Sequence, residues 1–249
     1  MARRVGTRGR FFLAYLVLGA AVGTGIGAFV VLLERPGPKP PPAWSSWKPA
    51  SGTPARSAVQ IATHIERTYR LPSGHQLARV VIGAPGQAQN IRAIGVPKVL
   101  QARTLGDFDL YDESRSVMYV LCGAGKNCHI KEGKATVGRG TVLRREALEL
   151  ALYTLKYSEP IENVVVFFPP GPTQKKLTFA LFFRRSDLVK ELDRPLKRTL
   201  PHALPPLPGK IDPGEKATVD DLTGTRIFRY LGVANAANFG EVVVLQPTA

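Results

Sequence analysis

The sequence predicts an α/β or α+β domain with a mixed sheet and packed helices, preceded by one transmembrane helix. Three observations support this prediction. Residues 11–33 carry no charged side chain. A proline-rich segment follows, and the remaining chain alternates helix-like with strand-like hydrophobic patterns. Hydrophobic residues make up 44% of the 249 residues, which is enough for a packed core and excludes wholesale disorder.

Residues 11–33 have the length of a membrane-spanning helix. At about 1.5 Å per residue they extend roughly 34 Å, which covers a hydrocarbon core of about 30 Å. The apolar run of a cleaved signal peptide is usually about 7–15 residues, so a retained anchor is favoured over cleavage. Four arginines precede the run, against Arg35 and Lys39 just after it. The positive-inside rule therefore places residues 1–10 in the cytoplasm and the rest of this single-pass chain beyond the cell membrane.

Three glycines, Gly19, Gly23 and Gly27, recur every four residues within this apolar run. Small residues at this spacing form a smooth stripe on which a second helix can pack closely. The stripe predicts either self-association of the chain or a membrane-protein partner. The alternative is that these glycines have no partner, since glycine is common in membrane helices.

Residues 34–54 predict an extended linker, because they contain seven prolines. Polyproline conformations rise about 3 Å per residue. Trp44 and Trp47 lie in this linker and belong either to an aromatic belt at the membrane surface or to a contact with the folded domain. The domain itself is expected over residues 55–249.

The first half of the domain predicts one helix followed by strands. Apolar side chains at helical spacing place the helix at residues 55–70. The strand candidates that follow, with residues 112–115 as the turn between the last two, are residues 76–83, 91–100, 108–111 and 116–121.

Residues 142–157 show the clearest helical pattern in the chain. Their apolar positions cover an arc of about 200°, which predicts a helix packed on a sheet and covered on a second side. Arg145, Glu146 and Glu149 share the remaining face with Lys156. Arg144 falls inside the apolar arc and is either extended toward solvent or a paired, buried arginine.

The second half of the domain contains further strands and an irregular stretch. Residues 164–168 are apolar without interruption, which is typical of an interior strand. Residues 194–224 contain six prolines and predict a lid or a wrapping arm. The remaining elements are strands at 177–183, 226–231 and 241–245 and a short helix at 188–192.

Cys122 and Cys128 are the only cysteines in the chain. Outside the cytoplasm, two cysteines flanking a short glycine-containing loop predict a disulfide, with a stabilising effect of at most about 2.4 kcal/mol. His129 would supply only a third ligand to a metal, one fewer than a closed zinc site requires. A disulfide is therefore favoured over a metal site or a redox pair.

The formal net charge of +15 predicts an anionic partner. Without the four arginines before the apolar run, the chain has 30 basic and 19 acidic residues, a net charge of +11. Lipid head groups, acidic wall polymers or an acidic protein fit this charge, whereas nucleic acid is disfavoured outside the cell. The basic residues Lys175, Lys176, Arg184 and Arg185 form either the binding face or an ordinary solvated surface.

Asp107, Asp109 and Asp112 form the one carboxylate cluster that could support catalysis or a divalent cation. The preferred interpretation is a solvated strand face followed by a turn, because the calcium-loop pattern fails. The four histidines, at positions 64, 75, 129 and 202, have no metal-binding spacing. No motif predicts a cofactor: residues 123–126 lack the full phosphate-loop pattern, and the Ser-x-x-Lys at residues 45–48 lies in the linker without its partner motif.

Three segments, Leu121–Cys128, Leu143–Tyr157 and Val164–Pro170, are similar to segments of uncharacterised, membrane-anchored bacterial proteins of high-GC type. This resemblance implies no established activity and supplies no catalytic residue. The leading hypothesis is a membrane-tethered, non-catalytic extracytoplasmic module that binds or organises cell-envelope components or a membrane complex. The alternative is an extracytoplasmic enzyme that uses Asp107, Asp109 and Asp112. The two hypotheses differ in whether these carboxylates converge in one pocket.

Overall fold

The computed structural model describes residues 7–34, 43–87, 90–99, 102, 104–123, 125–171, 174, 176–236 and 239–248. The chain forms two compact units, Met1–Pro42 and Ala43–Ala249. The first unit contains one helix of 28 residues, α1 (Thr7–Glu34), which includes the three glycines of the predicted stripe. A Cβ atom added at Gly19 or Gly23 would meet no described atom within 4 Å.

Over the residues that the structure describes, no helix combines the length and the apolar character that crossing a membrane requires.

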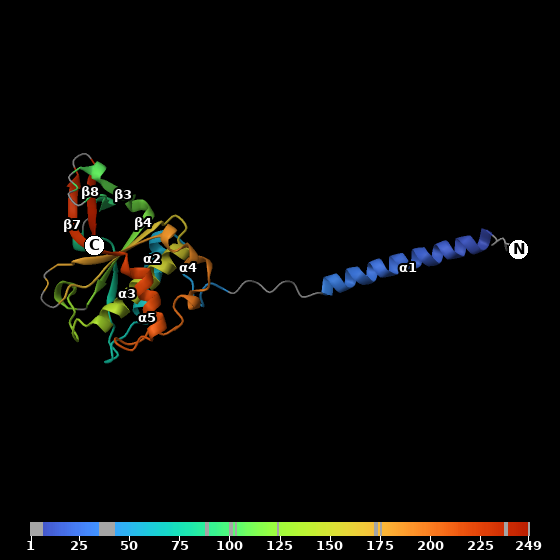
Figure 1. Cartoon of the computed structure of the whole chain (residues 1–249), viewed down its shortest axis with the longest axis horizontal. Helices are drawn as coiled ribbons and strands as arrows, with labels where there is room; N and C mark the ends of the chain where they lie inside the picture. The colour runs from blue at the N-terminus through green and yellow to red at the C-terminus, as the bar shows by residue number, and fades with distance from the viewer. Residues whose placement is uncertain are drawn as a thin grey trace. The chain divides into compact units, whose positions relative to one another are not determined.

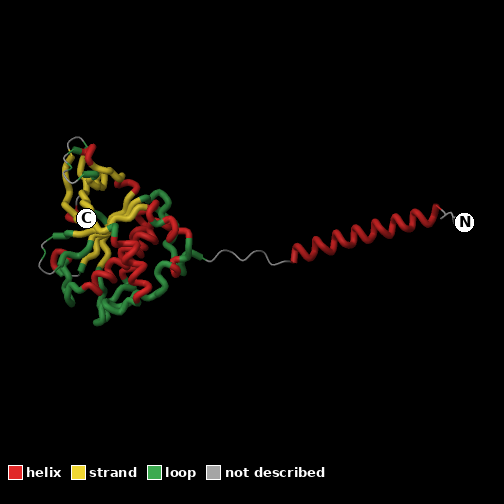
Figure 2. Tube along the Cα trace, in the orientation of Figure 1, coloured by secondary structure: helices red, strands yellow, loops and turns green. Residues whose placement is uncertain are grey.

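An eight-stranded mixed sheet forms the centre of the second unit (Figures 1 and 2), as the sequence predicts. Its order is β1-β4-β5-β6-β7-β8-β2-β3. The β4–β5 and β2–β8 pairs are parallel and the other pairs are antiparallel. The strands are β1 (Arg79–Ile82), β2 (Ile91–Pro97), β3 (Phe108–Asp112), β4 (Ser116–Cys122), β5 (Asn163–Phe167), β6 (Phe179–Arg184), β7 (Ile227–Ala236) and β8 (Gly240–Pro247).

The helices of this unit gather on one side of the sheet (Figure 1). They are α2 (Pro54–Glu66), α3 (Val137–Tyr157), α4 (Val189–Asp193) and α5 (Pro213–Gly224). The central helix α3 connects the parallel strands β4 and β5, and its Leu148 and Leu152 are fully buried in the same core as Tyr119 and Val166 of the sheet. The predicted helix at residues 142–157 is confirmed, and its broad apolar arc is explained because α2 and α5 also contact it.

A second, smaller core lies on the opposite face of β4, β5 and β6. Val165 and Phe182 pack there with Ile94 and Val243 from the other half of the sheet. The ring of Tyr111 on the edge strand β3 lies 4.8 Å from the ring of Phe182 in the middle of the sheet. The sheet therefore curls so that its far half covers its own centre. This double covering explains the uninterrupted apolar sequence of β5, whose five residues are all buried.

The turn expected at residues 112–115 is present as a short 3-10 turn, η3 (Glu113–Arg115), but the strands that it joins are not neighbours. β3 pairs only with β2, whereas β4 lies between β1 and β5. Five consecutive residues of β4 are buried, so this strand requires an interior position. Three of the five residues of β3 are exposed and none is fully buried, so this strand fits an edge.

The proline-rich stretch expected to be irregular over residues 194–224 contains the helix α5. Asp212 caps its N-terminus by accepting a hydrogen bond from the Glu215 backbone N–H at 3.0 Å, and Pro213 occupies the first helical position. Proline is compatible with this position because the N–H there needs no partner within the helix. The preceding residues, 194–212, form a wrapping arm that passes over α3. A Cβ atom added to Gly138 of α3 would lie 2.7 Å from the Gly209 nitrogen of this arm.

The wrapping arm and α5 supply polar partners to Arg145 on the charged face of α3. Arg145 is 1% exposed and Glu146 is fully buried, although the sequence places both outside the apolar arc. Arg144 takes the paired alternative and forms an ion pair with Asp220 of α5. Periodicity predicts which residues share a face of a helix, but it cannot show that a later segment supplies polar partners to a charged face.

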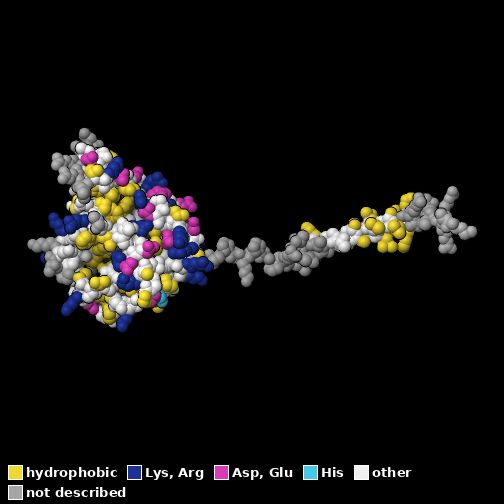
Figure 3. All heavy atoms as spheres, viewed as in Figure 1, with side chains coloured by type: hydrophobic (Ala, Val, Ile, Leu, Met, Phe, Trp, Pro, Cys, Tyr) yellow, Lys and Arg dark blue, Asp and Glu magenta, His cyan; other side chains and the backbone are white. Residues whose placement is uncertain are grey.

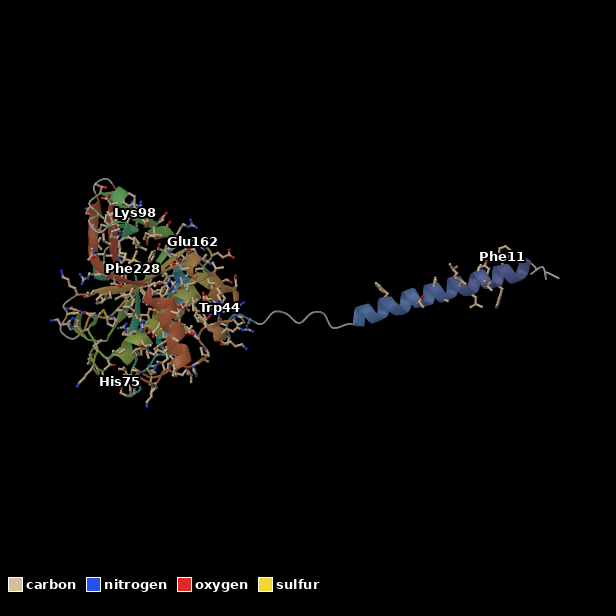
Figure 4. The ribbon with its side chains drawn as sticks, viewed as in Figure 1. Phe11, Trp44, His75, Lys98, Glu162 and Phe228 are labelled. Carbon is tan, nitrogen blue, oxygen red and sulfur yellow. A yellow bond between two sulfur atoms is a disulfide. The ribbon has the colours of Figure 1, made fainter. Side chains whose placement is uncertain are left out.

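Trp44 and Trp47 pack against the folded unit, which begins at Ala43, upstream of the start at residue 55 that the sequence suggests. Trp44 lies beside α4 (Figure 4), where its indole N–H donates to the Glu191 carbonyl oxygen at 3.2 Å. The Trp47 ring stacks on His64 with a centroid separation of 3.9 Å. The alternative of a contact with the folded domain therefore accounts for both tryptophans.

Candidate functional site

A hollow of about 630 Å³ lies beside the first turns of α3. Its walls are mainly apolar and include Val137, Leu143, Phe168, Phe179 and Ile227. These side chains come from α3, from the segment after β5 and from β6 and β7. The hollow thus lies near the carboxyl end of β5 and the amino end of the crossover helix, where open α/β sheets commonly bind ligands.

The polar groups of the hollow are mostly cationic or hydrogen-bond donors. Arg139 and Arg144 contribute to its lining, together with Thr136, Thr141 and Gln174. Thr136 caps α3, and the hollow is bordered by the positive end of this helix. Arg139 is 3% exposed and its Nε has no hydrogen-bond partner among the described residues. Burial lowers the pKa of Arg139 from its ordinary value.

The disulfide predicted between Cys122 and Cys128 is present directly after β4, in the connection that leads to the hollow. Asn127 and Cys128 within this loop adopt φ angles of 54° and 63°. Ile130, two residues after the second cysteine, forms part of the hollow. The cross-link therefore limits the freedom of a segment that shapes the cavity.

Of the basic residues proposed from the sequence, Arg184 and Arg185 are engaged by neighbouring oxygens. Arg184 forms two hydrogen bonds of 2.9 Å with Asp187. Arg185 donates to the Ile161 and Ser158 carbonyl oxygens and so supports the turn before β5. Lys176 is exposed, and Lys175 lies outside the described residues. Figure 3 shows Lys and Arg side chains spread over the visible face with acidic residues between them.

The three aspartates of the alternative enzyme hypothesis have separate surroundings. Asp107 accepts hydrogen bonds from the Thr104 backbone N–H and hydroxyl, at 2.8 and 3.0 Å. Asp109 lies 3.6 Å from the Lys98 ammonium. Asp112 accepts from the Ser114 backbone N–H at 2.9 Å, and this bond lowers the pKa of its exposed carboxyl. Nothing in the described structure brings these carboxylates together as acid and base or as ligands of one ion.

An extended ionic network lies between α2, α3, α5 and the wrapping arm, on the charged face of α3. The Arg145 guanidinium donates to Glu215 Oε1 at 2.7 Å, to Glu149 Oε2 at 3.0 Å and to the His202 carbonyl oxygen at 2.7 Å. The Tyr69 hydroxyl donates to Glu149 at 2.6 Å. Burial lowers the pKa of Arg145, but Tyr69 and the carboxylates outweigh it, so this pKa is raised.

Three side chains at the solvent end of this network could hold a metal ion. Suitable ligand atoms of His202, Asp212 and Glu215 lie within 4.8 Å of one another, the one such group among the described residues. Sequence reasoning does not find this group, because nine residues of irregular chain, 203–211, lie between His202 and Asp212. The signal that could have been used is the Asp-Pro-x-Glu start of α5, which places the two carboxylates on adjacent positions of one helix end.

A second hollow, of about 520 Å³, lies between α2, β1 and the turn η3. Glu113 is the one titratable side chain in its lining. This hollow therefore has fewer groups that could bind a charged ligand than the hollow at α3 has.

Comparisons with known proteins identify no relative of this chain: no family model matches it, and neither a curated protein nor a solved structure does.

Proposed function

We propose that this protein is a membrane-tethered, non-catalytic extracytoplasmic module that binds an anionic amphiphile of the cell envelope in the hollow at the start of α3. The observation that carries this proposal is the composition of the hollow. Apolar walls from four elements adjoin a helix N-terminus and two arginines. Apolar walls favour a hydrocarbon chain, and the positive helix end favours a carboxylate or phosphate head. Arg144 is paired with Asp220, and Arg139 donates to the Leu77 and Glu132 carbonyl oxygens, so both add positive charge beside the hollow without being free ligands.

The tether and the location belong to the same proposal. The uncharged run at residues 11–33 would serve as the anchor, and the four arginines before it would keep the N-terminus in the cytoplasm. The disulfide supports an extracytoplasmic location, since such bonds persist mainly in oxidising compartments. An anchored domain meets membrane amphiphiles at a high effective concentration, so a modest intrinsic affinity suffices.

The test uses residues 43–249, with a cooperative unfolding transition as the check of folding. Its probe is a short-chain phosphatidic acid below its micellar concentration, compared by calorimetry with the matching phosphatidylcholine. We expect at least tenfold tighter binding of the anionic lipid, which corresponds to about 1.4 kcal/mol. Added salt should weaken this preference, because exposed ionic contacts are screened beyond about 8 Å at physiological salt.

Val137→Glu is the diagnostic variant. Val137 is 84% exposed at the first position of α3, where an acidic side chain is compatible with the helix and would repel an anion in the hollow. Val189→Glu is the matched control, because Val189 is 52% exposed and begins α4, outside the lining of the hollow. Binding should fall at least tenfold in the first variant only. Equal binding of both lipids, or an equal loss in both variants, would refute the proposal.

A further inference from the structure

The strongest unassigned chemistry of the fold lies where the wrapping arm meets the start of α5. His202 Nδ1 is 2.7 Å from Glu215 Oε2 and 3.4 Å from Asp212 Oδ2. The His202 and Asp212 side chains are 55% and 46% exposed, whereas the Glu215 side chain is fully buried. An ion could therefore enter from solvent and meet one ligand that the core already fixes.

Each carboxylate is held so that one oxygen remains directed toward His202. Asp212 uses Oδ1 to cap α5, accepting from the Glu215 backbone N–H, while its Oδ2 faces the imidazole. Glu215 uses Oε1 to accept from the Arg145 Nε–H at 2.7 Å, while its Oε2 faces the same nitrogen. Such supporting hydrogen bonds orient metal ligands in known sites.

The carboxylates of the buried network also outnumber its cations. Arg145 is the one permanent cation that contacts Glu149 and Glu215 in the described part of the chain, and Asp212 adds a third carboxylate close by. Buried carboxylates are costly unless they are paired. A cation between His202, Asp212 and Glu215 would balance this excess.

We propose that His202, Asp212 and Glu215 form a binding site for a divalent transition-metal ion such as zinc. An imidazole favours these ions over magnesium and calcium, which prefer oxygen ligands alone. Ligand atoms about 2.1 Å from one ion lie roughly 3.0–3.4 Å apart at bond angles between a right angle and the tetrahedral angle. The spacing of His202 and Asp212 already fits, and His202 needs to move away from Glu215 by a few tenths of an ångström. Water would complete the coordination.

The test uses the full chain without a histidine tag, purified in detergent and treated with a chelator. Titration with zinc chloride should show one site per chain by calorimetry and should raise the melting temperature. His202→Gln keeps a side chain that can hydrogen-bond to Glu215, and Asp212→Asn keeps the helix cap. Each variant should retain the metal-free melting temperature and bind zinc at least tenfold more weakly than the natural chain.

His75→Gln is the matched control. His75 also contacts a carboxylate, Glu132, at 2.6 Å, but this exposed pair has no second acidic ligand within the described structure. Its removal should leave zinc affinity unchanged. The proposal is wrong if zinc, manganese and nickel all fail to bind or to stabilise the natural chain. It is equally wrong if magnesium binds as tightly as zinc, or if both diagnostic variants retain the affinity of the natural chain.

Discussion

Glu146 is a buried side chain whose two carboxyl oxygens have no hydrogen-bond partner among the described residues. Burial raises its pKa well above the ordinary value of 4.5, and the neighbouring Glu149 and Glu66 raise it further. The folded protein therefore keeps this group protonated at pH values where the unfolded chain has released the proton. The stability that depends on this proton is fully present below the unfolded pKa and is lost as the pH rises through the folded pKa.

Glu146→Gln should remove this loss, because an amide of the same shape carries no charge. We expect the variant to have a larger free energy of unfolding than the natural protein at pH 8, because folding of the natural protein at that pH requires a proton that the unfolded chain has released. The difference should shrink toward pH 4. Urea unfolding followed by circular dichroism at several pH values measures it, with the exposed Glu113→Gln as control. A variant less stable than the natural protein at pH 8 would contradict the prediction.

At the scale of elements, the segment containing Trp44 and Trp47 acts as an extra packing layer on α3 and α4. The Trp44 ring lies 5.3 Å from the ring of Tyr153 and 5.6 Å from that of Tyr157, both at edge-to-face angles. The Trp44 carbonyl oxygen accepts from the Leu196 N–H at 2.7 Å. Trp44 thus connects the start of the compact unit to α3 through its ring and to the wrapping arm through its backbone carbonyl.

Trp44→Ala should lower the free energy of unfolding of residues 43–249 by about 2 kcal/mol, below the usual range for a fully buried tryptophan because this ring is only half-buried. The measurement is urea unfolding followed by circular dichroism. Leu204→Ala is the control, since Leu204 is 78% exposed and should change the stability by less than about 0.5 kcal/mol. A loss at Trp44 no larger than that at Leu204 would show that the segment adds no stability.

The elements also show what local sequence can and cannot predict. β5 and the apolar arc of α3 were predictable because continuous or periodic apolar side chains directly reflect burial. The order of the strands was not, since β3 and β4 are adjacent in sequence but pair with different partners. The helix α5 was missed because prolines dominate its surroundings, although Asp212 and Pro213 are a regular helix start.

The site residues also divide into those that local sequence predicts and those that only the tertiary fold brings together. Two cysteines that flank a short glycine-containing loop were enough to predict the disulfide, because the signal lies within one local segment. The His202 group and the hollow at α3 depend on segments that only the tertiary fold brings together. Arg184 and Arg185 appear as free charges in the sequence, yet each is engaged by nearby carboxylate or carbonyl oxygens.

At the scale of the whole molecule, the proposed topology can be tested with one added thiol. Ser114 is exposed in the turn η3, and the natural cysteines are joined to each other. A membrane-impermeant maleimide should label Ser114→Cys in intact cells whose outer layers admit the reagent. The matched control is Thr7→Cys, at the start of α1 and before the apolar run, which should be labelled only after lysis. The reverse pattern, in folded protein, would overturn the proposed orientation.

The docked tryptophans have a mechanical consequence. If the domain is tethered to a membrane as proposed, it is pulled at the point where its chain leaves the fold. Here the first contacts to meet that tension are those of Trp44, whose backbone and indole are hydrogen-bonded to the wrapping arm and to α4. The load would therefore enter beside the C-terminal turns of α3, where Tyr153 and Tyr157 pack on Trp44, before it reaches α2.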